Sequence, residues 1–260
     1  MEINKKQLRI TFLGTGTSQG IPMIANNHPV CLSKDIKDNR LRSSILISWD
    51  NVSYTIDCGL DFRQQMLREN VQSLNGVFFT HEHADHIGGL DDLRAFCYQI
   101  GDMPIYATKR TLLNLEKRFD YIFSKENRYP GAPSVTPFVI DKESFVVDGL
   151  KVLPMEVYHG KLPIAAYRFN DFAYLTDAKY ISDEEKQKLQ NLDVLVVNAL
   201  RIDEHPTHFN LKEALDLIEE LKPKKAYLTH ISHMLGFHKE VSKELPENVF
   251  LAYDGLKIKV

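Results

Sequence analysis

The chain has 260 residues, of which 43% are hydrophobic and 26% are charged, and its formal net charge is −3. These values are ordinary for a soluble globular protein, and the length suits a single domain, which we predict to span residues 1–260. The net negative charge argues against a generally basic nucleic-acid-binding protein.

Short β-prone runs and amphipathic helical patterns follow one another along the chain. We expect strands near residues 8–13, 43–49, 52–57, 76–80, 104–107, 135–140, 144–147, 150–158, 165–169, 172–176, 193–197, 225–229, 249–253 and 256–260. We expect helices near residues 61–70, 87–99, 109–119, 182–190, 211–221 and 236–244. In each half strands precede helices, and two β-sheets packed face to face with helices outside them would satisfy this order.

The clearest functional pattern is the run Thr80–Leu90, which places three histidines and an aspartate within six residues: His81, His83, Asp85 and His86. Neutral imidazole and carboxylate are ligands that suit zinc and its first-row neighbours. In an extended stretch His81, His83 and Asp85 share one side, whereas His86 is offset. A solvated polar loop does not need three histidines at this spacing, so the run predicts a site for one or two metal ions.

Three later segments each end in a histidine or an aspartate at the point where a β-prone run stops. His159 follows residues 153–158, Asp177 follows 172–176, and His230 follows 225–229. Taken singly, each of these residues is more often a capping, packing or turn-forming residue. Their repetition after the histidine-rich run predicts that they complete the metal site.

Together these residues resemble the ligand pattern of the metallo-β-lactamase superfamily of dinuclear metallohydrolases. The resemblance implies an α/β (αββα) fold, a four-layer sandwich of two mixed β-sheets flanked by helices. It also implies two divalent metal ions, zinc or manganese, with iron as a further option. It assigns the first ion to His81, His83 and His159, the second ion to Asp85, His86 and His230, a bridging position to Asp177, and the orientation of a metal-bound imidazole to Asp57.

Four segments are similar to one branch of that superfamily, the PhnP-like phosphodiesterases that act on phosphoribosyl 1,2-cyclic phosphate. These segments are residues 42–44, 198–208, 229–233 and 252–256. The resemblance places His208 beside the metals as a proton donor to the leaving oxygen, whereas the alternative is a residue next to a helix cap without a chemical role. Arg201 and Arg42 are candidates for contacts to a substrate phosphate, with salt bridges as the alternative.

The expected function is therefore a dinuclear phosphodiesterase for a small or cyclic phosphodiester. Two ions would lower the pKa of a bridging water and give a hydroxide that attacks phosphorus, while Asp85 binds metal and orients this nucleophile. The alternatives are a tRNase Z-like or other nuclease, and a thioesterase or lactonase. No Gly-rich basic insertion that could form an RNA-binding arm is found. We therefore expect a small-molecule substrate rather than nucleic acid, and a homodimer is one option for the assembly.

One loop departs from the pattern of this branch. Many relatives carry a cysteine-rich loop that binds a structural zinc together with a later histidine. Here Asn26 and His28 stand at two of the three cysteine positions, whereas Cys31 and His233 remain. A site made of His28, Cys31 and His233 would lack a fourth protein ligand, so we predict that it is weak or empty.

Cysteine usage and the chain's N-terminus bear on location. The chain has three cysteines, Cys31, Cys58 and Cys97, which is too sparse and odd a set for a disulfide framework. We find neither an export signal nor an apolar run that approaches the length of a membrane span. These features predict a cytoplasmic protein that does not enter a membrane.

Overall fold

The computed structural model describes residues 6–124 and 129–260, and its strands form two mixed seven-stranded sheets. Residues 1–5, part of the segment in which we predict no export signal, lie outside the described residues. The first sheet has the order β14-β1-β2-β3-β4-β5-β6, and the second has the order β13-β12-β11-β10-β9-β8-β7. In the first sheet β3 to β6 are parallel and the other pairs antiparallel, and in the second β10 to β13 are parallel.

The strands agree closely with the β-prone runs of the sequence. Those of the first sheet are β1 (Arg9–Gly14), β2 (Ser44–Trp49), β3 (Val52–Ile56), β4 (Gly76–Phe78), β5 (Met103–Thr108), β6 (Val135–Ile140) and β14 (Lys257–Lys259). Those of the second are β7 (Phe145–Val147), β8 (Leu150–His159), β9 (Leu162–Phe169), β10 (Phe172–Leu175), β11 (Val194–Asn198), β12 (Lys225–Thr229) and β13 (Val249–Leu251).

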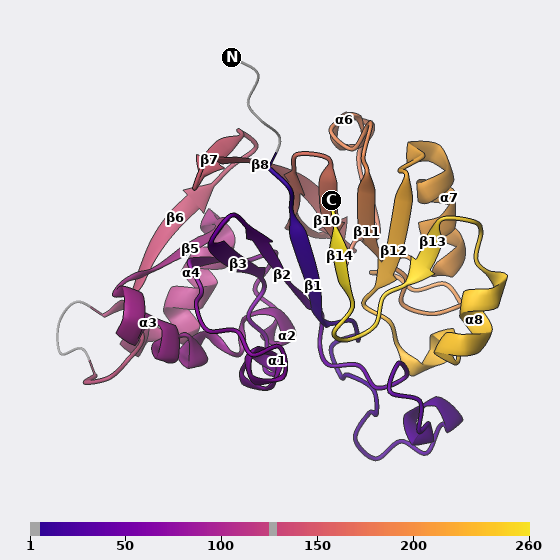
Figure 1. Ribbon diagram of the computed structural model, residues 1–260, viewed down its shortest axis with the longest axis horizontal. Helices are drawn as coiled ribbons and strands as arrows, with labels where there is room; N and C mark the ends of the chain where they lie inside the picture. The colour runs from indigo at the N-terminus through magenta and orange to yellow at the C-terminus, as the bar shows by residue number, and fades with distance from the viewer. Residues whose placement is uncertain (1–5, 125–128) are drawn as a thin grey trace.

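The helices cover the outer faces of the two sheets. They are α1 (Phe62–Arg68), α2 (Ala84–Ile87), α3 (Arg94–Ile100), α4 (Lys109–Arg118), α5 (Asp120–Phe123), α6 (Asp183–Gln187), α7 (Leu211–Leu221) and α8 (His238–Glu244), with 3-10 turns at Pro29–Leu32, Leu90–Leu93 and His233–Leu235. In Figure 1 α7 and α8 lie outside the second sheet, whereas α1, α3 and α4 lie beside the first. In the described part of the chain, no helix combines the length and the apolar character needed to cross a membrane.

Alternation along the strands separates three apolar layers. Phe12, Phe78 and Tyr167 belong to the cluster buried between the sheets. Phe79, next to Phe78, faces the other way into the cluster beneath α1, α3 and α4. The strand β11 is buried on both faces, which agrees with the continuous apolar run of its first four residues, 194–197. The predicted four-layer αββα sandwich with two mixed sheets is therefore confirmed.

The predicted helix over residues 87–99 is wrong in its boundaries. The chain instead forms the short helix α2, a turn at Gly88 and Gly89, a 3-10 turn and then α3. A Cβ atom on Gly89 would lie 2.2 Å from the carbonyl oxygen of Gly59, so the close approach of the two backbones leaves no room for a side chain at this turn. One consequence is that Asp85 and His86 project from a helical turn rather than from an extended stretch.

Candidate functional site

The predicted metal ligands come together from five separate places in the chain. His81 and His83 lie in the loop after β4, and Asp85 and His86 lie on α2. The second sheet contributes the residues at or just after the ends of β8, β10 and β12, which are His159, Asp177 and His230. Because these elements end at the same edge of the sandwich, residues distant in sequence form one cluster.

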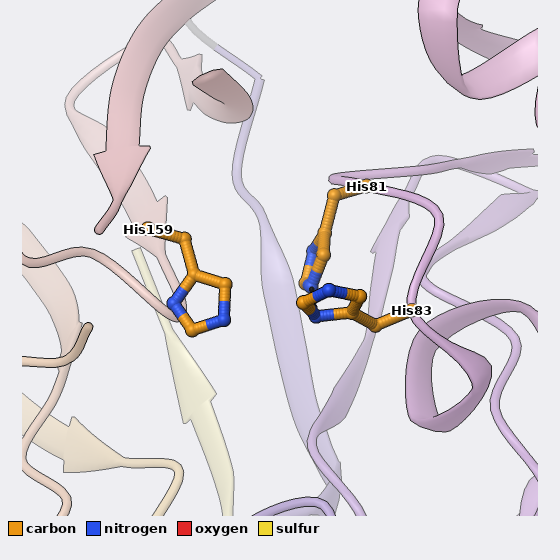
Figure 2. Close-up of side chains that lie close together, drawn as sticks. All are labelled: His81, His83 and His159. Atoms are coloured by element: carbon orange, nitrogen blue, oxygen red, sulfur yellow. Dashed lines mark hydrogen bonds between the residues drawn. The ribbon is translucent and has the colours of Figure 1, made fainter. Parts of the chain in front are cut away.

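The first group consists of three imidazoles. The ligand atoms of His81, His83 and His159 all lie within 4.8 Å of one another. Figure 2 shows the His159 ring, which β8 carries, facing the rings of His81 and His83 from the loop after β4. The Nδ1 atom of His159 donates a hydrogen bond to the carbonyl oxygen of Thr207 at 2.7 Å, so its Nε2 atom is left for the cluster.

The second group centres on Asp177. Its Oδ1 atom lies 3.1 Å from Nδ1 of His230 and 3.4 Å from Nε2 of His86, while its Oδ2 atom lies 3.9 Å from Nε2 of His81. Asp85 Oδ2 lies 3.2 Å from Nε2 of His86. Asp177 therefore lies between the two groups, as a carboxylate shared by both would have to.

Three residues of the site have an unusual backbone conformation. Their φ angles are 64° at Asp57, 59° at Asp177 and 54° at His230. These values lie in the left-handed region that residues other than glycine rarely adopt. Each of them directly follows a strand or lies within two residues of its end. A left-handed residue breaks the regular alternation of side chains between the two faces of a strand. Such a conformation costs free energy and persists where the surrounding structure holds it.

Asp57 fixes the orientation of His86. Its Oδ2 atom accepts a 2.6 Å hydrogen bond from Nδ1 of His86, and its Oδ1 atom accepts one from the backbone nitrogen of Thr80 at 2.8 Å. Both Asp57 and His86 are fully buried. Burial raises the pKa of Asp57, and this effect outweighs the neighbouring His86, which acts to lower that pKa. The contact agrees with the role that the family resemblance implies for Asp57, the orientation of a metal-bound imidazole, which stays a prediction.

The charges within the cluster depend on burial and on one another. Burial lowers the pKa of His81 well below its ordinary value and that of His230 to about 3, so both rings are neutral at neutral pH. Burial also acts to lower the pKa of His86, but Asp85, Asp177 and Asp57 together raise it well above its ordinary value. Burial would raise the pKa of Asp177, but His230 and His86 outweigh it, so the carboxylate stays ionised.

The donor set fits divalent metal ions. Nε2 of His86 is buried and makes no hydrogen bond with the described residues, although two carboxylate oxygens lie within 3.4 Å of it. Such an atom is costly to bury unless something binds it. Neutral imidazoles with ionised carboxylates are the ligands that zinc and its neighbours prefer. The cluster of histidines and aspartates indicates divalent metal binding.

His208 joins the cluster from the segment that precedes α7. Its Nε2 atom lies 3.2 Å from Oδ2 of Asp177, and its ring centre lies 4.4 Å from that of His159. His205 lies behind it, with Nδ1 atoms 3.1 Å apart. Sequence reasoning missed His205, although its spacing of three residues from His208 within one polar segment is a signal that could have identified it.

The two predicted phosphate contacts are engaged elsewhere in the structure. Arg42 pairs with Asp61 at 2.9 Å and donates to the carbonyl oxygen of Ser18. Arg201 donates to the carbonyl oxygens of Asp203 and Glu204 at 3.3 and 2.6 Å. These bonds favour the structural alternative for both arginines, and their contact with a substrate phosphate stays a prediction.

The candidate loop site is only partly assembled. The rings of His28 and His233 lie 4.9 Å apart, and the amide of Asn26 lies 3.2 Å from Nε2 of His233. Nδ1 of His28 accepts a hydrogen bond from the backbone nitrogen of Val30. Within the described ranges, His28, Cys31 and His233 do not gather into a group of metal-ligand atoms. His28 and His233 instead take part in contacts with Val30 and Asn26, and a weak or empty metal site in this loop stays a prediction.

Comparisons with known proteins identify the family. Residues 53–231 match the model of the β-lactamase superfamily domain. A solved structure described as a new diphosphatase from the PhnP family is 39% identical, with a TM-score of 0.92 and coverage of 98% of this chain and 97% of that one. A ribonuclease Z of Borrelia recurrentis is 24% identical over 299 residues, or 85% of this chain and 92% of that protein.

A curated octanoyltransferase of Porphyromonas gingivalis is 40% identical over 253 residues. The match covers 96% of this chain but 51% of that protein, so the chain spans about half the length of this relative. The fold, the cluster and the matched family agree with one another. The chain belongs to the metallo-β-lactamase superfamily and resembles its PhnP-like members.

Proposed function

We propose that this metal-dependent hydrolase cleaves a phosphodiester in a small substrate. The observation that carries the proposal is the position of His208, whose Nε2 atom lies 3.2 Å from Asp177 at the edge of the ligand cluster. A proton donor beside the metals suits a leaving alkoxide, which is a strong base. The similarity over nearly the whole chain to a diphosphatase of the PhnP family supports phosphorus rather than carbon as the atom attacked.

The cluster would hold two divalent ions, zinc or manganese, with iron also suited to the ligands. His81, His83 and His159, whose ligand atoms form one group, would bind one ion. Asp85, His86 and His230 would bind the other, since Asp85 and His230 group with Asp177, and His86 groups with Asp177 and His81; Asp177 would be shared by both ions. When bound, the ions would offset charge on the phosphoryl oxygens and lower the pKa of the attacking water toward neutrality.

The protein's own groups would orient the reactants and move the protons. The carboxylate of Asp85 accepts a hydrogen bond from the attacking water and directs its oxygen at phosphorus. A new P–O bond forms to that oxygen, the water loses a proton to solvent, and the P–O bond to the leaving group breaks with its electron pair on oxygen. That oxygen takes the Nε2 proton of His208. The products are a phosphomonoester and an alcohol, so water is the only co-reactant.

A diphosphate linkage is the second candidate substrate bond. The diphosphatase relative favours it, because that protein is similar over 98% of this chain. The same residues could act, since the leaving phosphate also departs as an oxyanion. Because ribonuclease Z is among the relatives, nuclease activity is an alternative function. The octanoyltransferase relative makes a reaction on an acyl group another alternative, although the chain matches only 51% of that protein.

A substrate comparison tests the proposal. Metal-quantified protein, supplied with zinc or manganese, would be given bis-p-nitrophenyl phosphate, a p-nitrophenyl ester, a phosphomonoester and a dinucleoside diphosphate. We expect preference for the diester over the ester and the monoester, and loss of that activity by at least about 100-fold in an Asp85→Ala variant. Faster cleavage of the diphosphate would favour the second candidate. Preference for the carboxylic ester, or no activity with two metals bound, would overturn the assignment to phosphorus.

A further inference from the structure

The segment that carries His208 contains a second histidine whose protonation can be deduced from its contacts. The backbone nitrogen of Thr207 lies 3.3 Å from Nδ1 of His205 in hydrogen-bonding geometry. A backbone nitrogen can only donate, so Nδ1 of His205 accepts and carries no proton. The ring of His205 is therefore the tautomer with its proton on Nε2. Burial, followed by the charges of His208 and Arg201, lowers the pKa of His205, which favours this neutral form.

This tautomer determines the role of the neighbouring ring. Nδ1 of His208 lies 3.1 Å from Nδ1 of His205, and two nitrogens at that distance need one proton between them. Because His205 has none to give at this atom, His208 must donate from Nδ1. The hydroxyl of Thr207 lies 3.2 and 3.0 Å from the same two nitrogens and can join the contact. The exchangeable position of His208 is then Nε2, which points to Asp177.

The surrounding chain holds this pair of histidines in place. Arg201 binds the carbonyl oxygens of Asp203 and Glu204, immediately before His205. The carbonyl oxygen of Thr207 accepts a hydrogen bond from His159. His208 is 9% exposed, and its backbone neighbour Phe209 donates to the carbonyl oxygen of Ala178. The segment is thus tied on both sides of the pair.

We propose that His205 is a positioning residue that holds the imidazole of His208 with its Nδ1 proton directed outward and its Nε2 atom directed at the leaving oxygen. His205 does for His208 what a carboxylate does for the histidine of many catalytic pairs, because it accepts a hydrogen bond from Nδ1 and so fixes the orientation of the ring. The inference rests on the proposed phosphodiesterase function. It assigns His205 a part in proton donation without contact with the substrate.

The test compares leaving groups on one substrate scaffold. Bis-p-nitrophenyl phosphate releases a weakly basic nitrophenolate, whereas diphenyl phosphate releases the more basic phenolate, which needs the proton more. With the zinc-loaded protein, His205→Leu should lower kcat by about tenfold or more for diphenyl phosphate and by less than about twofold for bis-p-nitrophenyl phosphate. KM and zinc content should stay unchanged. His205→Asn should restore part of the lost rate, because its Oδ1 atom can accept the same proton.

Glu204→Leu serves as the matched control, because this side chain is exposed and only the backbone of Glu204 is used in the contacts above. An equal loss on both substrates, or no loss on either, would overturn the proposal. A wild-type protein that cleaves neither diester would instead sink the proposed function itself. If His205→Leu fails to fold, ¹⁵N NMR of histidine-labelled wild-type protein decides, since the proposal requires a proton on Nδ1 of His208 and none on Nδ1 of His205.

Discussion

The charge of His86 is set by the carboxylates that surround it. Three carboxylates, Asp85, Asp177 and Asp57, act on one buried imidazole and raise its pKa well above the ordinary value, although burial alone would lower it. The other buried rings behave oppositely, since burial lowers the pKa values of His81, His159 and His230. Without metal, His86 is therefore positively charged, in contrast to His81 and His230, whose buried rings are neutral at neutral pH.

This charge predicts how the stability of the metal-free protein depends on pH. Consider a histidine whose pKa is higher in the folded than in the unfolded state. It stabilises the fold fully at pH values below its unfolded-state pKa of about 6.5, and this contribution is lost as the pH rises through the folded-state pKa. The rings with lowered pKa values affect stability below about pH 6.5, and the buried thiol of Cys58, whose pKa burial raises, affects it at higher pH than His86 does. A window from about pH 7 to 8 therefore reports mainly on His86.

In urea unfolding with a chelator present, we expect the free energy of unfolding to fall by up to about 1.4 kcal/mol per pH unit in that window. The slope should flatten in a His86→Gln variant. Parallel profiles for the two proteins would show that His86 is not charged in the metal-free fold.

At the scale of the elements, the site is made where strands and helices end. The β-prone runs of the sequence predict the strands, and each terminal histidine or aspartate was placed correctly because a strand end is a local property. The four-residue helix α2 was not predicted, since it is too short for a periodic pattern and the chain turns at once through Gly88 and Gly89. The contact between His205 and His208 was also not predicted from the sequence, because it depends on how the irregular segment 205–208 brings the two rings together.

The N-terminus of α7 supports that segment. Asn210 accepts a hydrogen bond from the backbone nitrogen of Glu213, and Glu213 reaches back to the backbone nitrogen of Asn210, which forms a capping box. Asn210→Ala should lower the free energy of unfolding by about 1 kcal/mol. Lys212→Ala, which removes only an exposed ion pair with Asp216, should change it by less than about 0.5 kcal/mol. Chemical denaturation measures both, and equal effects would argue against the cap as the source of stability.

At the scale of the whole molecule, the aromatic layer between the sheets holds the two halves of the site at a fixed spacing. The ring centre of Phe78 lies 5.4 Å from the ring centres of both Tyr167 and Phe169 in the facing sheet. The Tyr167 hydroxyl donates a hydrogen bond to the carbonyl oxygen of Phe79. The apolar runs predict buried strands, but not which sheet each one joins. The C-terminal strand β14, for example, pairs with β1 at the other end of the chain, and no local pattern specifies that contact.

Phe169 tests this layer, because it is fully buried and lies far along β9 from the ligand cluster. Phe169→Ala should lower the free energy of unfolding by about 3–5 kcal/mol, through lost burial and the cavity left behind. Phe250→Ala is the matched control with a ring that is 42% exposed, and its cost should be clearly smaller. Thermal or urea unfolding of both variants checks the order, and a larger cost at Phe250 would contradict it.

The most direct test of the central claim is the metal content of the protein together with its activity. After reconstitution with zinc and removal of excess, we expect about two equivalents per chain by elemental mass spectrometry, and hydrolysis of bis-p-nitrophenyl phosphate that requires both. Asp177→Ala should bind less than two equivalents and lose hydrolysis. Full diesterase activity in the chelated protein, or two equivalents retained in Asp177→Ala with unchanged rates, would contradict a shared metal site at this cluster.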